Sequence, residues 1–246
     1  MKFICLLFAV SLNVWADELP KTVMTTRGKL LVSEDFAQPI APFEGKTNGF
    51  ASGFSGWCYR PGPTKRNTWK VADGVLTGIE SAEAHHPATL SYGVDFKDVI
   101  IQCEVRLDDV PAEGRLYRSL FVKATDARDY VCGVFMGPGG LTAMAYSDTR
   151  INPATKQRDK EPPARIAATV KLNEWHTVLL EIKGDEMVGT LDGQSVTCQN
   201  LLIAADKHSI MLGAGTVASF RHLRVWEGLP NPEWAKLKPA LKVPGK

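Results

Sequence analysis

The sequence has almost no excess of charge of either sign. It carries 29 lysine and arginine residues against 27 aspartate and glutamate residues, a formal net charge of +2 over 246 residues. Proteins that bind nucleic acid through bulk electrostatics concentrate positive charge on their surface. The balanced composition therefore disfavours a nucleic-acid partner, and a hydrophobic share of 44% is that of an ordinary globular protein.

Several metal-binding and nucleotide-binding patterns are also missing. The chain has no Cys-x-x-Cys pair and no His-Glu-x-x-His segment, which are spacings that hold zinc. Residues 213–218 match a dinucleotide-binding pattern in their letters, but a strand-like segment follows where a helix would have to begin. We therefore expect no zinc site and no nucleotide cofactor of the usual kinds.

The chain opens with the pattern of a secretory signal peptide. Lys2 precedes an apolar run that begins at Phe3, and small residues precede Asp17. This order predicts cleavage after Ala16 and a secreted or periplasmic protein without residues 1–16. A membrane anchor is the alternative, but the apolar run falls short of the roughly 20 residues that span a bilayer.

Removal of the leader would leave four cysteines, at positions 58, 103, 132 and 198. An even number in an oxidising compartment is compatible with disulfides in any of three pairings. The alternative is four buried thiols that pack as small hydrophobic side chains. The alternation of Cys103 with Ile101 and Val105 makes this alternative credible, and the sequence does not choose between the two.

The body of the chain predicts an all-β fold. From about residue 30 to 227, short runs of β-branched and aromatic residues alternate with turn residues at the spacing of a sandwich or barrel. Asp-Gly pairs at 73–74 and 192–193 predict tight hairpins because these residues accept positive φ angles. We expect one β-sandwich domain over residues 17–228, followed by a Pro- and Lys-rich tail over residues 229–246 that is extended or disordered.

Residues 99–107 predict a strand with two distinct faces. Alternation places Ile101, Cys103, Val105 and Leu107 on an apolar face and Gln102, Glu104 and Arg106 on a polar one. A carboxylate beside a cation in a cleft has the properties of a general acid or base. The alternative is an exposed ion pair of little energetic value.

Five segments of the chain form a recognisable pattern: LVSEDF (31–36), NTWKVADGVLTGIE (67–80), HPATLSYGVDFKDVIIQCEVRL (86–107), NEWHTVLLEIKGDEMVGTLDGQSV (173–196) and VASFRHLRVWEG (217–228). Together they resemble the concanavalin A-like lectin/glucanase superfamily and, more narrowly, the 3-keto-disaccharide hydrolase domain family, which is family 16 glycoside hydrolase-like. The resemblance implies an antiparallel two-sheet jelly-roll sandwich with carbohydrate on or beside its concave face. Two positions depart from the family pattern: Leu116-Tyr117-Arg118-Ser119 replaces an Asn-Ser-Gly motif, and His222 replaces an asparagine.

The resemblance also implies site residues. Glu104 and Arg106 match the family's Glu-x-Arg/Lys strand, which makes Glu104 the candidate acid or base and Arg106 its charge partner. The aromatic, planar and basic side chains expected to bind sugar are Gln102, His85, Arg118, Tyr146, Trp57 and Arg60. The acidic residues around Pro111 form a second candidate for a pair of catalytic carboxylates, with a solvated strand end as the alternative.

These observations favour an exported protein that hydrolyses or otherwise cleaves a glycosidic linkage. Two alternatives use the same fold without catalysis. One is a carbohydrate-binding module, and the other is a laminin-G-like interaction module with Ca²⁺ held by loop oxygens. The lost Asn-Ser-Gly motif favours a binding module, whereas the Glu-x-Arg strand favours an enzyme.

Overall fold

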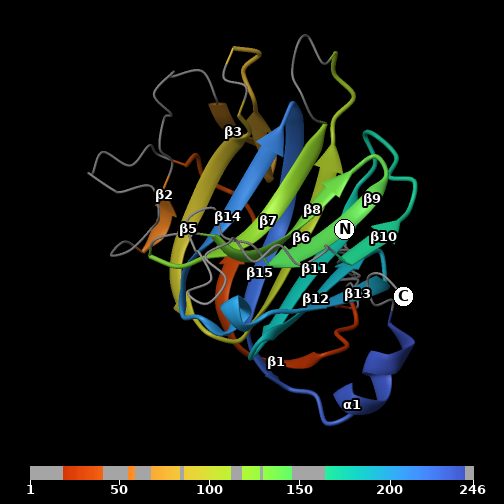
Figure 1. Cartoon of the computed structure of the whole chain (residues 1–246). Coiled ribbons are helices and arrows are strands. Elements are labelled where there is room, and N and C mark those ends of the chain that lie inside the picture. Colours follow the sequence, from red (N-terminus) through yellow and green to blue (C-terminus); the bar gives the residue numbers. More distant parts are fainter. Residues whose placement is uncertain are drawn as a thin grey trace, which may run out of the picture.

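The computed structural model describes residues 19–40, 55–58, 68–83, 86–111, 118–127, 130–145 and 164–241. Within these ranges almost all regular structure is β-strand, and the strands form two stacked antiparallel sheets (Figure 1). The predicted all-β sandwich is therefore confirmed. The predicted leader lies outside the described residues. No helix in the described ranges has the length and apolar character needed to cross a membrane.

The first sheet has eight strands, and its polar outer face carries the candidate site. These strands are β1 (Thr25–Glu34), β3 (Thr68–Ala72), β4 (Val75–Ile79), β6 (Val99–Leu107), β11 (His176–Lys183), β12 (Glu186–Leu191), β13 (Gln194–Gln199) and β15 (Val217–Pro230). Their order is β13-β12-β11-β6-β15-β4-β3, and β1 pairs with β15. The strand with two distinct faces, β6, thus lies between β11 and β15.

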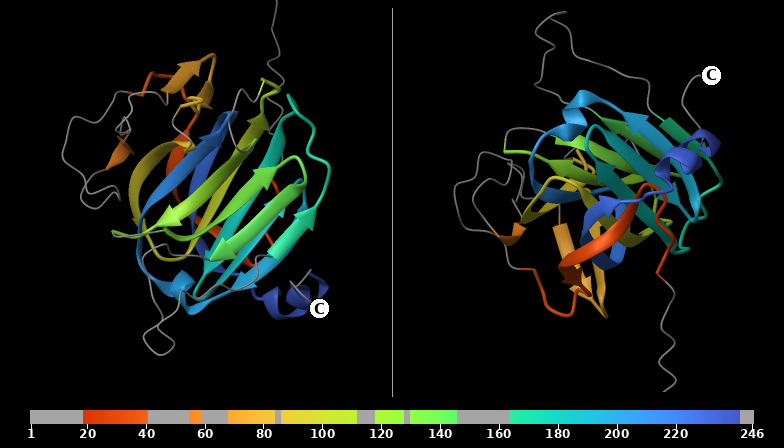
Figure 2. Two further views of the ribbon diagram at one scale, coloured as in Figure 1. Left: turned by 45° about the horizontal axis from the view of Figure 1, so that its top comes forward. Right: turned by 90° about the horizontal axis from the view of Figure 1, so that it is seen from below.

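The second sheet has seven strands and lies in front in Figure 1. These strands are β2 (Gly56–Cys58), β5 (Ala88–Phe96), β7 (Ser119–Thr125), β8 (Tyr130–Gly137), β9 (Gly140–Ala145), β10 (Ala164–Ala167) and β14 (Lys207–Gly215). Their order is β10-β9-β8-β7-β14-β5-β2. Two further views show how the sheets stack along their length (Figure 2).

The predicted hairpins form at the two Asp-Gly pairs. Asp73 and Gly74 have φ angles of 52° and 73° between β3 and β4, and Asp192 and Gly193 have φ angles of 47° and 82° between β12 and β13. Both residues of each turn lie in the left-handed region that a type I′ turn requires. The predicted meander is also present, as β11, β12 and β13.

The core lies between the sheets, and the side chains of β6 point alternately into the core and outward, as the sequence predicts. Ile101, Cys103 and Val105 are at most 1% exposed and belong to the inter-sheet core. Gln102 and Glu104 lie on the opposite, outer face of the sheet. The polar face of β6 therefore points away from the hydrophobic interior, as the candidate site requires.

The four cysteines that follow the predicted leader are all buried. Cys103 and Cys132 are thiols, which excludes an arrangement with all four cysteines in disulfides. Burial raises the pKa of Cys132 to about 12 and also raises the pKa of Cys103 well above its ordinary value. The two thiols pack as small hydrophobic groups and are poor nucleophiles.

The C-terminal tail packs against the eight-stranded sheet. Strand β15 continues to Pro230, and a short helix α1 (Trp234–Leu237) and a 3-10 turn (Lys238–Ala240) follow it. Trp234 Nε1 donates a hydrogen bond of 2.8 Å to Glu186 Oε2, and Lys238 forms an ion pair with the same carboxylate. The described part of the tail is therefore partly helical, not extended as expected, and is attached to the first residue of β12.

Candidate functional site

A β-bulge in β15 builds the candidate site. In the register with β6, Arg221 lies opposite Glu104 and Arg224 lies opposite Gln102, so β15 holds one residue more than β6 over this stretch. The extra residue is His222, with a φ angle of 52°. An extra residue interrupts strand alternation. The side chains of Arg221 and His222, although adjacent in sequence, therefore both contact Glu104.

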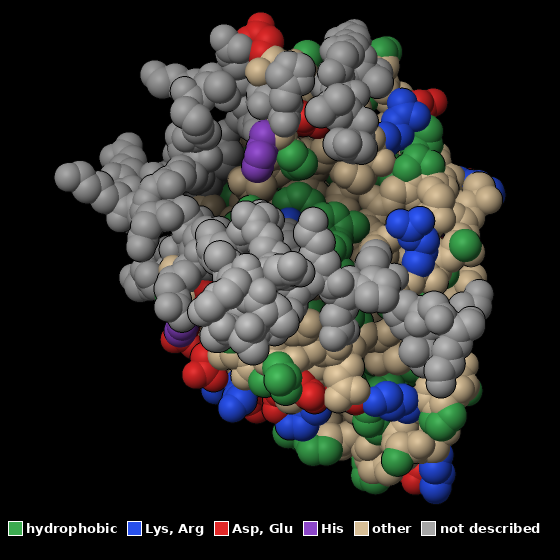
Figure 3. All heavy atoms as spheres, in the orientation of Figure 1, with side chains coloured by type: hydrophobic (Ala, Val, Ile, Leu, Met, Phe, Trp, Pro, Cys, Tyr) green, Lys and Arg blue, Asp and Glu red, His purple; other side chains and the backbone are tan. Residues whose placement is uncertain are grey.

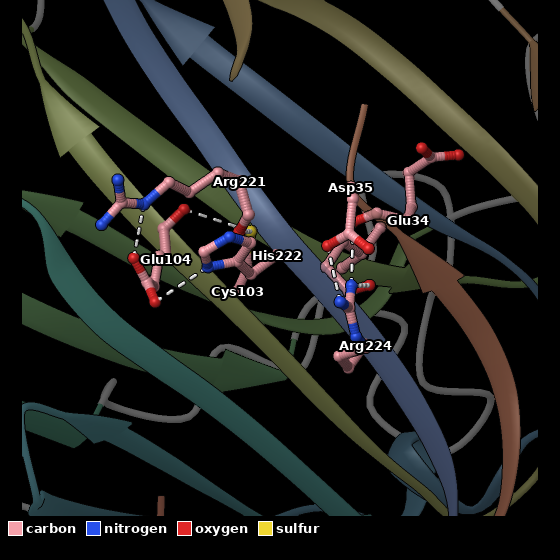
Figure 4. A network of polar contacts seen from close by, with 8 residues as sticks. Glu34, Asp35, Cys103, Glu104, Arg221, His222 and Arg224 are labelled. Atoms are coloured by element: carbon pink, nitrogen blue, oxygen red, sulfur yellow. Dashed lines mark hydrogen bonds and ion pairs between the residues drawn. The ribbon is translucent and has the colours of Figure 1, made fainter. Parts of the chain in front are cut away.

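These two side chains bind the two oxygens of the Glu104 carboxylate (Figure 4). Arg221 Nε donates to Oε2 at 2.5 Å, and His222 Nδ1 lies 3.1 Å from Oε1. Burial by itself would raise the pKa of Glu104, but the hydrogen bonds and charges of His222 and Arg221 outweigh it and lower the pKa below its ordinary value. Glu104 is therefore a carboxylate at neutral pH.

The prediction that Arg106 is the charge partner of Glu104 was wrong. Arg106 pairs instead with Asp108, with Nε 2.5 Å from Oδ1, and also donates to Ser219. Glu104 and Asp108 are each two residues from Arg106, so spacing along the chain does not choose between them. The bulge in β15 brings Arg221 to Glu104, and Arg106 pairs with the other acid, Asp108. The guanidinium groups of Arg106 and Arg221 lie 4.9 and 4.2 Å from the ring centroid of Trp175.

Glu104 and His222 line a pocket of about 410 Å³ on the outer face of the eight-stranded sheet. This volume is within the range of small-molecule sites. The lining residues are Leu19, Pro20, Asp35, Gln102, Glu104, Thr177, His222 and Arg224. Five of these residues lie on the neighbouring strands β6, β11 and β15, which form the floor of the pocket. Leu19 and Pro20 belong to the segment before β1, which forms one side.

Two arginines complete the polar surroundings of the pocket. Arg224 donates to Asp35 Oδ1 at 2.5 Å and to the carbonyl of Glu34 at 3.0 Å, which holds its guanidinium beside the pocket (Figure 4). Arg27 donates to Gln102 Oε1 at 3.2 Å and to the carbonyl of Pro20 at 2.6 Å. Gln102 is thus held in place from the N-terminal side, and the pocket contains fixed polar groups of both charges.

Two of the other predicted sugar-binding residues have contacts outside the lining of this pocket. Trp57 donates from Nε1 to Glu34 Oε2 at 2.9 Å, and its ring packs on Phe36 and Tyr92. Arg118 donates to the carbonyl of Val110 at 2.7 Å and pairs with Asp109, at the end of the connection between the sheets. Neither lines the pocket of Glu104.

Three further predicted sugar-binding residues lie outside the described part of the chain. They are His85, Arg60 and Tyr146. Their roles therefore stay predictions, as does a Ca²⁺ ion held by loop oxygens. Within the ranges that the structure describes, no group of three or more His, Cys, Asp or Glu side chains is placed to hold a metal ion.

Sequence reasoning missed His222, although a signal for it was present. Phe220 and Leu223 are three residues apart, yet both are buried in the core of the sandwich. In a regular strand, residues three apart point to opposite faces. Two apolar residues at this spacing, separated by Arg221 and His222, therefore indicate a bulge with two adjacent outward side chains.

The outer face of the seven-stranded sheet has a different character. Hydrophobic side chains gather near its centre (Figure 3). Lys123 on β7 is 5% exposed, and its Nζ lies 3.9, 4.1 and 4.7 Å from the ring centroids of Phe121, Tyr130 and Phe135. The cross-strand partner Gly133 leaves room for the lysine stem, since a Cβ there would lie 2.7 Å from Lys123 Cγ. Phe121 is itself only 5% exposed, whereas Tyr130 and Phe135 are partly exposed, so these two rings are the accessible aromatic groups beside the enclosed lysine.

The lowered pKa of Glu104 predicts a pH dependence of stability. A carboxyl group with a depressed folded-state pKa stabilises the fold above its unfolded pKa of about 4.3, and this contribution is lost as pH falls through the folded-state value. Glu104→Gln should therefore unfold at lower urea concentration than the wild type near neutral pH. The difference should shrink in acid. An equal difference at both pH values would contradict the ion-pair network.

Comparison with known proteins identifies the fold and a domain family. Residues 39–225 match the sequence profile of a family described as "3-keto-alpha-glucoside-1,2-lyase-like domain". A search of curated proteins gave no match.

Three solved structures share the architecture. A mutant of SCLam, an endo-beta-1,3(4)-glucanase of family GH16, has a TM-score of 0.55 at 12% identity and covers 85% of this chain and 99% of its own. LamAcat from Zobellia galactanivorans has a TM-score of 0.52 at 10% identity over 80% and 97%. The carbohydrate-binding module CBM66 from Bacillus subtilis has a TM-score of 0.51 at 11% identity over 72% and 99%. These similarities confirm the jelly-roll sandwich.

Proposed function

Because the chain belongs to the 3-keto-alpha-glucoside-1,2-lyase-like domain family, we propose that it cleaves the glycosidic bond of a 3-keto sugar in the pocket of Glu104 and His222. The family's name describes a 1,2-elimination from a glucoside that carries a ketone at C3. Such a reaction needs a base for the proton on C2. The observation that carries the proposal is the contact between an imidazole and a carboxylate in a polar pocket.

The ketone makes the reaction accessible to a side-chain base. The carbonyl at C3 acidifies the C2–H bond, so that a base removes the proton and leaves an enolate. When the carbonyl re-forms, a C1=C2 double bond is made and the C1–O bond breaks. The departing alkoxide takes a proton, which gives an unsaturated keto sugar and a free alcohol. A positioned general base typically contributes a factor of about 10² to 10⁴ to such a step.

The contacts of His222 suit the role of this base. Nδ1 is oriented by the Glu104 carboxylate, and His222 is half-exposed, with 49% of its side-chain surface accessible. Nε2 therefore takes the proton from C2, while Glu104 orients the ring and stabilises the imidazolium that forms. The same imidazolium then supplies the proton for the departing alkoxide.

The arginines have a separate role. The enolate carries negative charge near the ketone oxygen, and fixed cations stabilise such charge without reorganising. Arg224 lines the pocket and is held by Asp35 and Glu34. We assign it the position nearest the ketone. Arg221 acts through Glu104 and is a positioning residue.

A non-catalytic carbohydrate-binding module is the second candidate. It is favoured by the outer face of the seven-stranded sheet, where the partly exposed rings of Tyr130 and Phe135 lie beside Lys123. Aromatic faces stack on the C–H surfaces of sugar rings. In this case the protein would bind glycans through that sheet, and the pocket of Glu104 would have no catalytic role.

The enzyme and the binding module predict different results when the protein is mixed with two sugars. Purified protein is incubated with 4-nitrophenyl 3-keto-α-glucoside and, separately, with the parent glucoside. We expect nitrophenol release from the keto substrate alone, together with a primary isotope effect when C2 carries deuterium. Equal release from both substrates, without an isotope effect, would contradict elimination. Binding of either sugar without any release would favour the module.

Expression of the full chain in a secreting host tests the predicted leader. In a bacterial host that secretes through signal peptides, the mature protein should begin at Asp17, because the leader is expected to end at Ala16. N-terminal sequencing of the protein from the periplasm or medium checks this position. Recovery of the uncut chain from the cytoplasm alone would contradict the expected secreted or periplasmic location.

A further inference from the structure

The pocket has two ends that differ in chemistry. Glu104 and Gln102 lie on the same face of β6, two residues apart, which separates their Cα atoms by about 6.6 Å. His222 lies at the Glu104 end. At the Gln102 end, Arg27 links Gln102 to the carbonyl of Pro20. The segment before β1 therefore lies beyond Gln102, at the opposite end of the pocket from the proposed base.

This segment is firmly attached to the sheet. Glu181 on β11 is fully buried, and its carboxylate accepts hydrogen bonds from the backbone N–H groups of Val23, Met24 and Thr25 at 3.0, 2.9 and 2.8 Å. The Thr25 hydroxyl donates a fourth, at 2.7 Å. Because these bonds hold residues 23–25 against β11, the residues just before them keep a defined position beside the pocket.

Leu19 and Pro20 are the apolar members of a lining that is otherwise polar. Leu19 is 51% exposed, one of four exposed large hydrophobic side chains in the described ranges. An apolar ligand group that covered Leu19 would remove this surface from water, which is favourable. A hydroxyl-rich group would gain less there than at the polar end.

We propose that Leu19 and Pro20 form a subsite for the leaving group of the cleaved glycoside and that this group has an apolar face, as an aryl aglycone does. The proposal rests on the proposed function for the position of the reacting ring. With the keto sugar between His222 and Arg224, the group on O1 extends past Gln102 towards Leu19. The subsite then selects glycosides by their aglycone and leaves the chemistry at C2 unchanged.

The test compares two substrates in three variants. Phenyl and methyl 3-keto-α-glucosides present the same sugar with a large or a small leaving group. Leu19→Ala should lower kcat/KM for the phenyl substrate roughly fivefold relative to the methyl substrate, the effect expected for part of an apolar side chain. Leu19→Met keeps an apolar side chain and should keep the wild-type ratio. The control Leu201→Ala changes an exposed leucine outside the pocket and should have no effect.

These measurements distinguish a failure of the proposed subsite from a failure of the proposed reaction. An unchanged phenyl-to-methyl ratio in Leu19→Ala would overturn the subsite even if elimination is observed. If the wild type turns over neither substrate, calorimetric titration with the parent phenyl and methyl α-glucosides takes the place of kinetics. A phenyl preference that Leu19→Ala abolishes would support the subsite without the reaction. Equal binding of both glucosides, or binding of neither, would overturn it.

Discussion

His222→Asn is expected to reduce kcat/KM for a 3-keto-glucoside by a factor of about 10² to 10⁴, the usual contribution of a general base. Asparagine accepts the positive φ angle that His222 adopts in the bulge, so the backbone of β15 should keep its course. Its amide can still hydrogen-bond to Glu104 but cannot take a proton from carbon. The loss should therefore appear in kcat, with KM changed little.

This substitution is also informative because asparagine is the residue that the family pattern has at the position of His222. Activity retained by His222→Asn would contradict the role of His222 as the base and would direct attention to Glu104, which Glu104→Gln then tests. His208→Asn is a matched control, because His208 contacts Asp95 on the other sheet through a similar imidazole–carboxylate pair. We expect the control to retain wild-type kinetics.

Glu181→Ala is expected to destabilise the fold by about 3 kcal/mol. The substitution removes the acceptor of four hydrogen bonds and leaves buried donors unsatisfied, each of which costs about 1 to 3 kcal/mol when water cannot replace the partner. Some relaxation of residues 23–25 keeps the total below the sum. Urea unfolding followed by tryptophan fluorescence measures the change. The affinity of the pocket should fall as well, because Leu19 and Pro20 lose their attachment.

A surface carboxylate provides the control for this measurement. Glu174 forms an exposed ion pair with Lys171, and Glu174→Ala should change the free energy of unfolding by less than about 0.5 kcal/mol. An equally small change in Glu181→Ala would show that the segment before β1 is held by other contacts. It would also remove the argument for a fixed wall at the Gln102 end of the pocket.

Much of the fold could be predicted because its signals are local. The alternation of residues 99–107 predicted both faces of β6, and two Asp-Gly pairs predicted hairpins that the structure contains. The choice between disulfides and thiols could not be made in this way. It depends on which strands face each other across the core, and Cys103 and Cys132 come to lie in different sheets.

The site was predicted only in part for the same reason. Glu104 and Gln102 were expected on the polar face of β6, and both line the pocket. Arg106 was expected to pair with Glu104 because it is near in sequence, but Asp108 binds it. The actual partner, Arg221, is 117 residues from Glu104 along the chain. No local pattern reports a contact across two strands so far apart in the sequence.

The sequence by itself determined that the fold is all β, where the tight turns lie and which face of β6 is polar, because alternation and turn chemistry act between near neighbours. Only the tertiary structure decided which side chains meet Glu104. The pairing of β6 with β15, shifted by one residue at His222, selected Arg221 and His222 from all the basic residues of the chain. That pairing depends on packing between distant segments, since each strand buries its apolar face only when the whole sandwich has formed.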